Sequence, residues 1–308
     1  MNTPHFSIAA VERETGLSKD VLRVWERRYG FPLPERDDHG ERSYSAAQVE
    51  RLRLIKRLMD QGHRPGKLLA IPAEALAELA PRKPASTATA DSAADPDALN
   101  DLLTLIRQHD ALGYQQAMQQ RLGKQGLSTF VQDTVAPLTG RIGEAWEAGQ
   151  IEVFEEHLFT ELTKRLLRQA IAGLPGGKLQ PRVLLTSVPE EQHVLGLLMV
   201  ESLLALEGAE CIPLGTQMPL LEIVRAAEAH QADIVALSFS IAFPARQIPA
   251  LLQQLRDLLP QKVAIWAGGA GIIRSAAPPG VQLMPTLELA LEALAAWREM
   301  AMAYPGSR

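Results

Sequence analysis

The sequence predicts a multidomain protein, in which an all-α amino-terminal domain and a second helical domain precede an α/β domain. Three observations support this fold class. After residue 183, short apolar runs alternate with helical stretches, as in a parallel sheet covered by helices. From residue 98 to 172, apolar residues recur only at helical spacing. Residues 81–97 are rich in Pro, Ala, Ser and Thr, without bulky apolar residues, which predicts a flexible linker. We therefore expect domains at 1–80, 98–176 and 180–302.

The amino-terminal domain has the outline of a helix-turn-helix. A short helical pattern covers Ser7 to Thr15, Gly16 provides a turn, and Ser18 is placed to cap a second helix. Ser45 is the expected cap of a longer helix that reaches about Gln61. In such a motif the second helix usually lies in the major groove of DNA and contacts the base edges.

Charge supports the same interpretation of this domain. The whole chain has a net charge of −5, but residues 1–70 contain 13 Lys and Arg against 10 Asp and Glu. A charged helix face is most often simply solvated. Nevertheless, this domain is the only part of the sequence that we expect to contact nucleic-acid phosphates.

The order of residues in this domain resembles the winged helix-turn-helix of the MerR transcription regulators. The resemblance rests on the phrase from Leu22 to Gly30 (LRVWERRYG), followed by Pro34, Arg36, Arg42 and Tyr44. It implies double-stranded operator DNA as the partner. It further implies a set of contact residues, with major-groove contacts from the second helix and backbone contacts from the wing: Lys19, Arg23 and Arg27, then Arg42 and Tyr44.

The second helical domain is expected to contain four helices. Within it, Trp146 precedes Gly149, where a helix break is expected, and Glu156-His157 follows early in the next helix. On one continuous helix Trp146 and Glu156 would lie about 15 Å apart, whereas a break lets both approach one site. A core tryptophan beside an ordinary exposed Glu-His pair is the plainer alternative.

The strands of the α/β domain are expected at 183–188, 211–214, 233–238, 263–267 and 281–284. The predicted strand order is 2-1-3-4-5, the flavodoxin-like (Rossmann-type) arrangement. In such a sheet, ligands bind outside the carboxyl ends of the strands. The residues that follow these ends are therefore the candidate site.

Glu191, His193 and Gly196 follow the first strand at E-x-H-x-x-G spacing. A loop histidine can offer one ring nitrogen to a metal while a nearby carboxylate holds the other, which fixes the tautomer. Alone, such a pair is more often a solvated surface pair. Small residues at the neighbouring strand ends favour a binding slot instead, namely Gly215, Ser238, Ser240, Gly268 and Gly269.

Together these residues resemble the cobalamin-binding domain of methionine synthase, the corrinoid mutases and corrinoid-binding regulators. That family joins a D-or-E-x-H-x-x-G loop to S-x-L and G-G elements. The resemblance implies that His193 ligates cobalt from below, with the displaced nucleotide tail beside the serine and glycines. Ser240 stands where the family has leucine, a departure that concerns the packing of the tail.

The spacing of Trp146 from Glu156-His157 resembles the helical module of the CarH and LitR light-sensing regulators. The resemblance implies that these three residues cap the upper adenosyl group of adenosylcobalamin. It also implies a repressor that binds operator DNA in the dark as a homotetramer and is released by light. Related regulators carry a histidine directly after the tryptophan, where this chain has Glu147.

Two alternatives remain open from the sequence. The α/β domain could serve assembly or protein binding in a cobalamin-independent regulator, or the chain could be a corrinoid methyl carrier. No catalytic nucleophile, acid–base pair or phosphate loop is evident, so we expect no enzyme. The single cysteine, Cys211, and the lack of a signal peptide or apolar span predict a bacterial cytoplasmic, nucleoid-associated protein without membrane contact.

Overall fold

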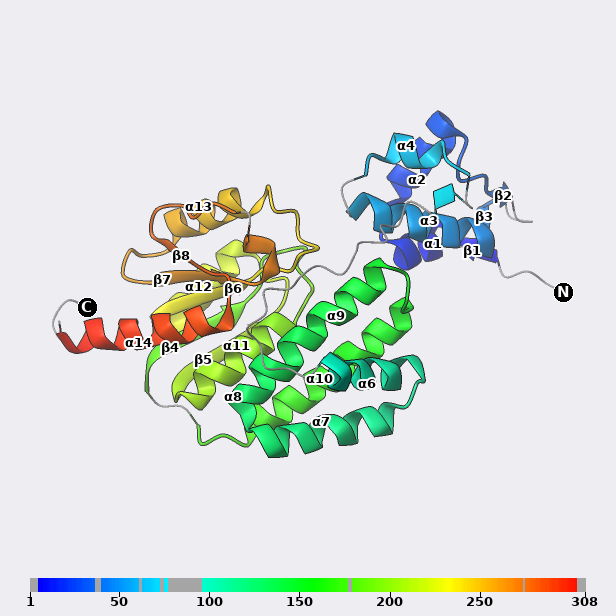
Figure 1. The fold of residues 1–308 in the computed structure, drawn as a ribbon. Coiled ribbons are helices and arrows are strands. Elements are labelled where there is room, and N and C mark those ends of the chain that lie inside the picture. The colour runs from blue at the N-terminus through cyan, green and yellow to red at the C-terminus, as the bar shows by residue number, and fades with distance from the viewer. Residues whose placement is uncertain are drawn as a thin grey trace. The chain divides into compact units, whose positions relative to one another are not determined.

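The computed structural model describes residues 5–36, 40–60, 63–72, 75–76, 96–176, 179–273 and 275–303. The chain forms two compact units, one of residues 1–89 with 145–150 and one of the remaining residues (Figure 1). Each unit is described separately below. The expected linker, 81–97, lies outside the described residues except for its last two positions.

The first unit contains the expected helix-turn-helix. Ser7 Oγ accepts a hydrogen bond from Ala10 N, and Ser18 Oγ accepts one from Val21 N, so both serines cap helices. Three short antiparallel strands in the order β1-β3-β2 form the wing that the resemblance to MerR regulators implied. The elements are β1 (His5–Ser7), α1 (Ile8–Thr15), α2 (Lys19–Tyr29), β2 (Glu35–Arg36), β3 (Arg42–Ser45), α3 (Ala46–Asp60) and α4 (Pro65–Leu69).

The helical segment of residues 96–172 contains the four expected helices, of which the third is interrupted by a π-helical segment and has its last residues, 145–147, in the first unit. Gly149, with a φ of 68°, lies between the third and fourth helices, which confirms the expected break. The segments are α6 (Pro96–Arg107), α7 (Ala111–Gln125), α8 (Leu127–Thr129) with η1 (Phe130–Val135) and α9 (Ala136–Glu147), and α10 (Val153–Ala172).

The α/β part has a five-stranded parallel sheet in the order β5-β4-β6-β7-β8, which confirms the predicted 2-1-3-4-5 order. Its strands are β4 (Leu179–Thr186), β5 (Ala209–Gly215), β6 (Ile234–Ser238), β7 (Ala264–Gly268) and β8 (Val281–Met284). Its helices are α11 (Leu195–Leu206), α12 (Leu220–Ala229), α13 (Ile248–Leu258), the 3₁₀ turn η2 (Ala270–Ile272) and α14 (Leu287–Ala303). In the described ranges, none of the helices has the length and apolar character of a membrane span.

Helices cover both faces of this sheet (Figure 1). α12 and α13 pack on one face, and α11 and α14 on the other, because alternate strand residues point to opposite faces. α11 also packs against α10, α8 and η1. It therefore joins the sheet to the helical bundle, and its first turn lies next to the candidate site.

A buried carboxylate lies on α11, on the side that meets the sheet and bundle. Glu201 is only 5% exposed. Burial raises the pKa of Glu201, and attraction to Arg168 opposes this only in part. Burial, with a further contribution from Glu201, also raises the pKa of Cys211 to about 12, so its thiol stays protonated.

Replacing Glu201 with glutamine is expected to stabilise the protein increasingly as the pH rises. Because folding raises the pKa of Glu201, the wild type loses stability as pH rises through that value. We therefore expect the variant to have a higher free energy of unfolding than the wild type near pH 8 and little difference near pH 5. Chemical denaturation at both pH values measures it. The exposed control Glu228→Gln should show no pH-dependent gain, and an equal gain in both variants would contradict this account.

Candidate functional site

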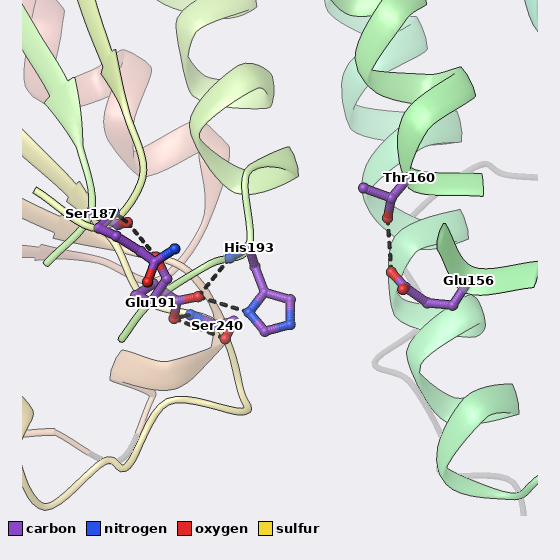
Figure 2. Close-up of polar contacts among 7 residues, drawn as sticks. Glu156, Thr160, Ser187, Glu191, His193 and Ser240 are labelled. Atoms are coloured by element: carbon purple, nitrogen blue, oxygen red, sulfur yellow. Dashed lines mark hydrogen bonds and ion pairs between the residues drawn. The ribbon is translucent and has the colours of Figure 1, made fainter. Parts of the chain in front are cut away.

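The loop between β4 and α11 holds His193 through a buried carboxylate. Glu191 is 1% exposed, and its Oε1 accepts a hydrogen bond from His193 N at 2.9 Å and lies 2.7 Å from His193 Nδ1. Its Oε2 accepts hydrogen bonds from Ser240 N at 2.7 Å and Ser240 Oγ at 2.9 Å. Figure 2 shows both oxygens engaged in this way. The loop after β6 thus fixes the carboxylate that orients the histidine.

These hydrogen bonds set the charges of the pair. The hydrogen bond to Glu191 raises the pKa of His193, against the effect of burial, and the charges of Glu191 and Glu156 add to the rise. Burial alone would raise the pKa of Glu191, but the hydrogen bonds from His193 and Ser240 outweigh it and hold the pKa below its usual range. Glu191 is therefore an ionised acceptor, and Nδ1 is the nitrogen that carries the proton.

A second serine, Ser187, which no sequence motif marks, holds the loop backbone. Ser187 is fully buried, and its Oγ donates to Glu191 O at 2.7 Å and accepts from Gln217 N at 2.9 Å. Gln217 follows β5 and has a φ of 62°. No motif marks Ser187 or Gln217, because their roles depend on loops that are distant in the sequence.

The strand ends require small residues, because neighbouring loops approach their backbone too closely to leave room for a Cβ atom. A Cβ on Gly196 would lie 2.6 Å from Ser238 Oγ, and a Cβ on Gly269 would lie 2.4 Å from the carbonyl oxygen of Phe239. Gly268 O accepts a hydrogen bond from Phe239 N at 2.9 Å, and Gly215 O accepts one from Thr186 Oγ1 at 3.0 Å. The expected small residues therefore lie together at the carboxyl edge of the sheet.

The bundle contributes Glu156 on the opposite side from His193. Figure 2 shows the imidazole directed toward α10, where Glu156 lies in the first turn, and the charge of Glu156 acts on His193. The Glu156 side chain is 31% exposed, and His157 beside it is 71% exposed. Trp146 lies in the last turn of α9, before the break at Gly149. Its part in capping a ligand stays a prediction.

The free nitrogen of His193 defines the chemistry of this site. The His193 side chain is 59% exposed, and Nε2 has no hydrogen-bond partner in the described ranges. Among the described residues, no group of three or more His, Cys, Asp or Glu side chains converges to hold a metal ion. One imidazole cannot provide the ligand set of an ordinary protein metal centre. The arrangement fits a metal ion that arrives within a cofactor supplying its other ligands.

The cations expected to bind DNA lie on or beside α2. Lys19 lies 3.6 Å from Glu12, Arg23 lies 3.2 Å from Asp20, and Arg42 bonds to Glu26 at 2.8 Å. Arg27 is exposed on the helix. The major-groove roles of these residues stay predictions.

The expected contact of Tyr44 with the DNA backbone does not fit the structure. Tyr44 is 0% exposed and belongs to the core of the first unit, with Val11, Leu22 and Trp25. Its hydroxyl is buried as well. The alternation of strand β3 explains this placement, because residues on either side of Tyr44 point to the other face. We therefore assign Tyr44 to packing rather than to phosphate contact.

Comparison with known proteins agrees with this arrangement. Residues 6–68 match the family described as "MerR HTH family regulatory protein", and residues 98–171 and 181–294 match two families described as "B12 binding domain". The chain is 31% identical to the HTH-type transcriptional repressor CarH of Myxococcus xanthus, over 83% of this chain and 85% of the relative. It is 27% identical to the repressor CarA of the same organism, over 86% of each chain.

A solved structure shares the fold over 65% of this chain. The monomethylamine corrinoid protein of Methanosarcina barkeri aligns with a TM-score of 0.52 at 18% identity, over 65% of this chain and 98% of that chain. The helix-turn-helix, the two B12-binding matches and the identity over most of both chains lead to one assignment. The chain belongs to the family of CarH-type transcription regulators, which join a MerR helix-turn-helix to cobalamin-binding domains.

Proposed function

We propose that the protein is an adenosylcobalamin-dependent, light-sensitive repressor that binds operator DNA in the dark as a homo-oligomer, most simply a tetramer, and leaves it after illumination. The observation that carries the proposal is the His193 site. An exposed imidazole with a free Nε2 is held on a buried carboxylate, and a carboxylate on the bundle faces it. Membership of a family that includes the CarH repressor supports the regulatory part.

Residues of the α/β domain would contact one side of the ligand, and residues of the helical bundle would contact the other side. His193 Nε2 would hold cobalt from below, with Glu191 and Ser240 fixing the ring. The slot beside Gly196 and Ser238 would take the displaced nucleotide tail. Glu156, His157 and Trp146 would enclose the upper group. When bound, adenosylcobalamin supplies a cobalt–carbon bond that visible light breaks.

The regulatory link requires a difference in affinity between two states. A ligand shifts an assembly only by as much as it binds one state more tightly than the other. Residues on α10 would contact the upper group, while α11 carries the lower ligand loop and packs against α10. Loss of the upper group would then change what α10 contacts. The assembly that binds DNA would be the state favoured in the dark.

Size-exclusion chromatography with visible absorbance tests this proposal. The full-length protein is mixed with adenosylcobalamin in darkness, run, illuminated with green light and run again. We expect cobalamin to elute with a large assembly in the dark and the assembly to become smaller after light. A sample with hydroxocobalamin, which lacks the adenosyl group, should show no change of size with light.

Each other outcome rejects a specific part of the proposal. Protein that elutes without cobalamin would point to the cofactor-independent regulator. Bound cobalamin with no change of size on illumination would show a cobalamin sensor whose output is not disassembly by light. The same light-dependent change of size with hydroxocobalamin would show that the upper adenosyl group is not needed for the response.

A further inference from the structure

The hydroxyl of Thr160 bonds to a carboxylate on its own helix, whereas three other helical threonines bond to the helix backbone. Thr15, Thr104 and Thr139 each donate to the backbone carbonyl four residues earlier, as threonines in helices commonly do. Thr160 Oγ1 instead donates to the side chain four residues earlier, Glu156 Oε1, at 2.8 Å. The hydroxyl is therefore used to fix a carboxylate rather than to satisfy the helix.

One oxygen of Glu156 is held by a neighbour on α10. Oε1 accepts the hydrogen bond from Thr160, while Oε2 lies 3.8 Å from Nδ1 of His157, beyond hydrogen-bond distance. Figure 2 shows this carboxylate on the side of α10 that faces His193. A glutamate side chain ordinarily has several free rotamers, and restricting them before binding lowers the entropic cost of a later contact.

An ionised carboxylate can only accept hydrogen bonds, so it recognises groups that carry donors. An adenosyl group has ribose hydroxyls that can donate, whereas a methyl group has no donor. Glu156 can therefore distinguish these two upper groups only if its free lone pairs are directed toward the ligand. Thr160 is the residue that restricts this direction.

We propose that Thr160 is a positioning residue, which aims the Glu156 carboxylate and thereby makes the site selective for a cobalamin whose upper group carries hydroxyls. The inference rests on the proposed function, because it assumes cobalamin between Glu156 and His193. It adds a residue that touches no ligand itself. Its effect is on selectivity between upper groups rather than on the cobalt ligand.

The test compares Thr160→Val with Thr160→Ser in the full-length protein. Valine keeps the branched shape without the hydroxyl, and serine keeps the hydroxyl without the methyl group. Each protein is titrated in darkness with adenosylcobalamin and, separately, with methylcobalamin, and the visible spectrum reports binding. We expect Thr160→Val to weaken adenosylcobalamin binding by about three- to tenfold, as for the loss of one hydrogen bond, and to leave methylcobalamin binding unchanged. Thr160→Ser should retain the wild-type preference.

A second comparison establishes that the effect passes through Glu156. In a Glu156→Ala background, Thr160→Val should cause no additional loss of adenosylcobalamin affinity. Equal weakening of both cobalamins by Thr160→Val would show a structural role and overturn the inference. Wild-type affinities in Thr160→Val would overturn it as well. Failure of the wild-type protein to bind either cobalamin would instead reject the proposed function, so the two failures are distinguishable.

Discussion

Replacing His193 with alanine is expected to abolish stable cobalamin binding. The variant loses the ring nitrogen that the β4–α11 loop presents to a metal, while Glu191 keeps its hydrogen bonds from Ser240. Removing a partner that merely orients a ligand already costs about 10- to 100-fold in metal affinity, so loss of the ligand itself should cost at least about 100-fold. Titration with adenosylcobalamin in darkness, followed by visible absorbance, measures the change.

A matched control is His230→Ala, because His230 is an exposed histidine that caps α12 away from the β4–α11 loop. This control should bind with wild-type affinity. Circular dichroism of both variants should match the wild type, because the His193 side chain is itself largely exposed. Normal affinity and an unchanged visible spectrum in His193→Ala would refute the assignment of His193 as ligand.

Replacing Gly269 with alanine is expected to cause the largest loss of stability of any single methyl addition at the site. Gly269 has φ 93° and ψ 170°, a region that only glycine occupies readily. The new Cβ would also lie 2.4 Å from the carbonyl oxygen of Phe239, which accepts a hydrogen bond from Gly271 N. Backbone cannot rotate away as a side chain end can. We expect a loss of about 3 kcal/mol or more in the free energy of unfolding.

Gly215→Ala provides the control for this substitution. Gly215 also has a positive φ, 78°, but a Cβ there would have no atom within 4 Å. Gly215→Ala should therefore lose only about 1 kcal/mol in the free energy of unfolding, from backbone strain. Chemical denaturation of both variants measures the difference. If both variants lost the same free energy of unfolding, the loop after β6 would have moved to relieve the contact with Phe239. That contact would then contribute nothing to the loss of stability.

Most of the α/β fold could be predicted because its signals are local. Each buried strand appears as a short apolar run, and the predicted strand at 281–284 coincides with β8. The beginning of α11 at Leu195 is less evident from the sequence, because a hydrogen bond to Glu191 keeps His193 in the loop. Helix caps such as Ser18 were also predictable, since a cap is determined within four residues.

The site could be predicted only in part. The sequence indicated Glu191, His193 and Gly196, because their spacing is local. It could not indicate that Ser240 donates two hydrogen bonds to Glu191, because this contact joins loops 49 residues apart. Tyr44 was misassigned for a related reason. Its contact with DNA was implied only by the resemblance to MerR regulators, and only the packing of the core shows that it is buried.

The position of α11 has a mechanical consequence. This helix has 12 residues and is therefore a rod of about 18 Å, which begins two residues after His193 and lies between the sheet and the bundle. The His193 loop is therefore followed directly by a regular helix that packs against both layers, and not by a flexible connection. A displacement of the His193 loop would therefore act on the sheet and on the bundle through the same helix.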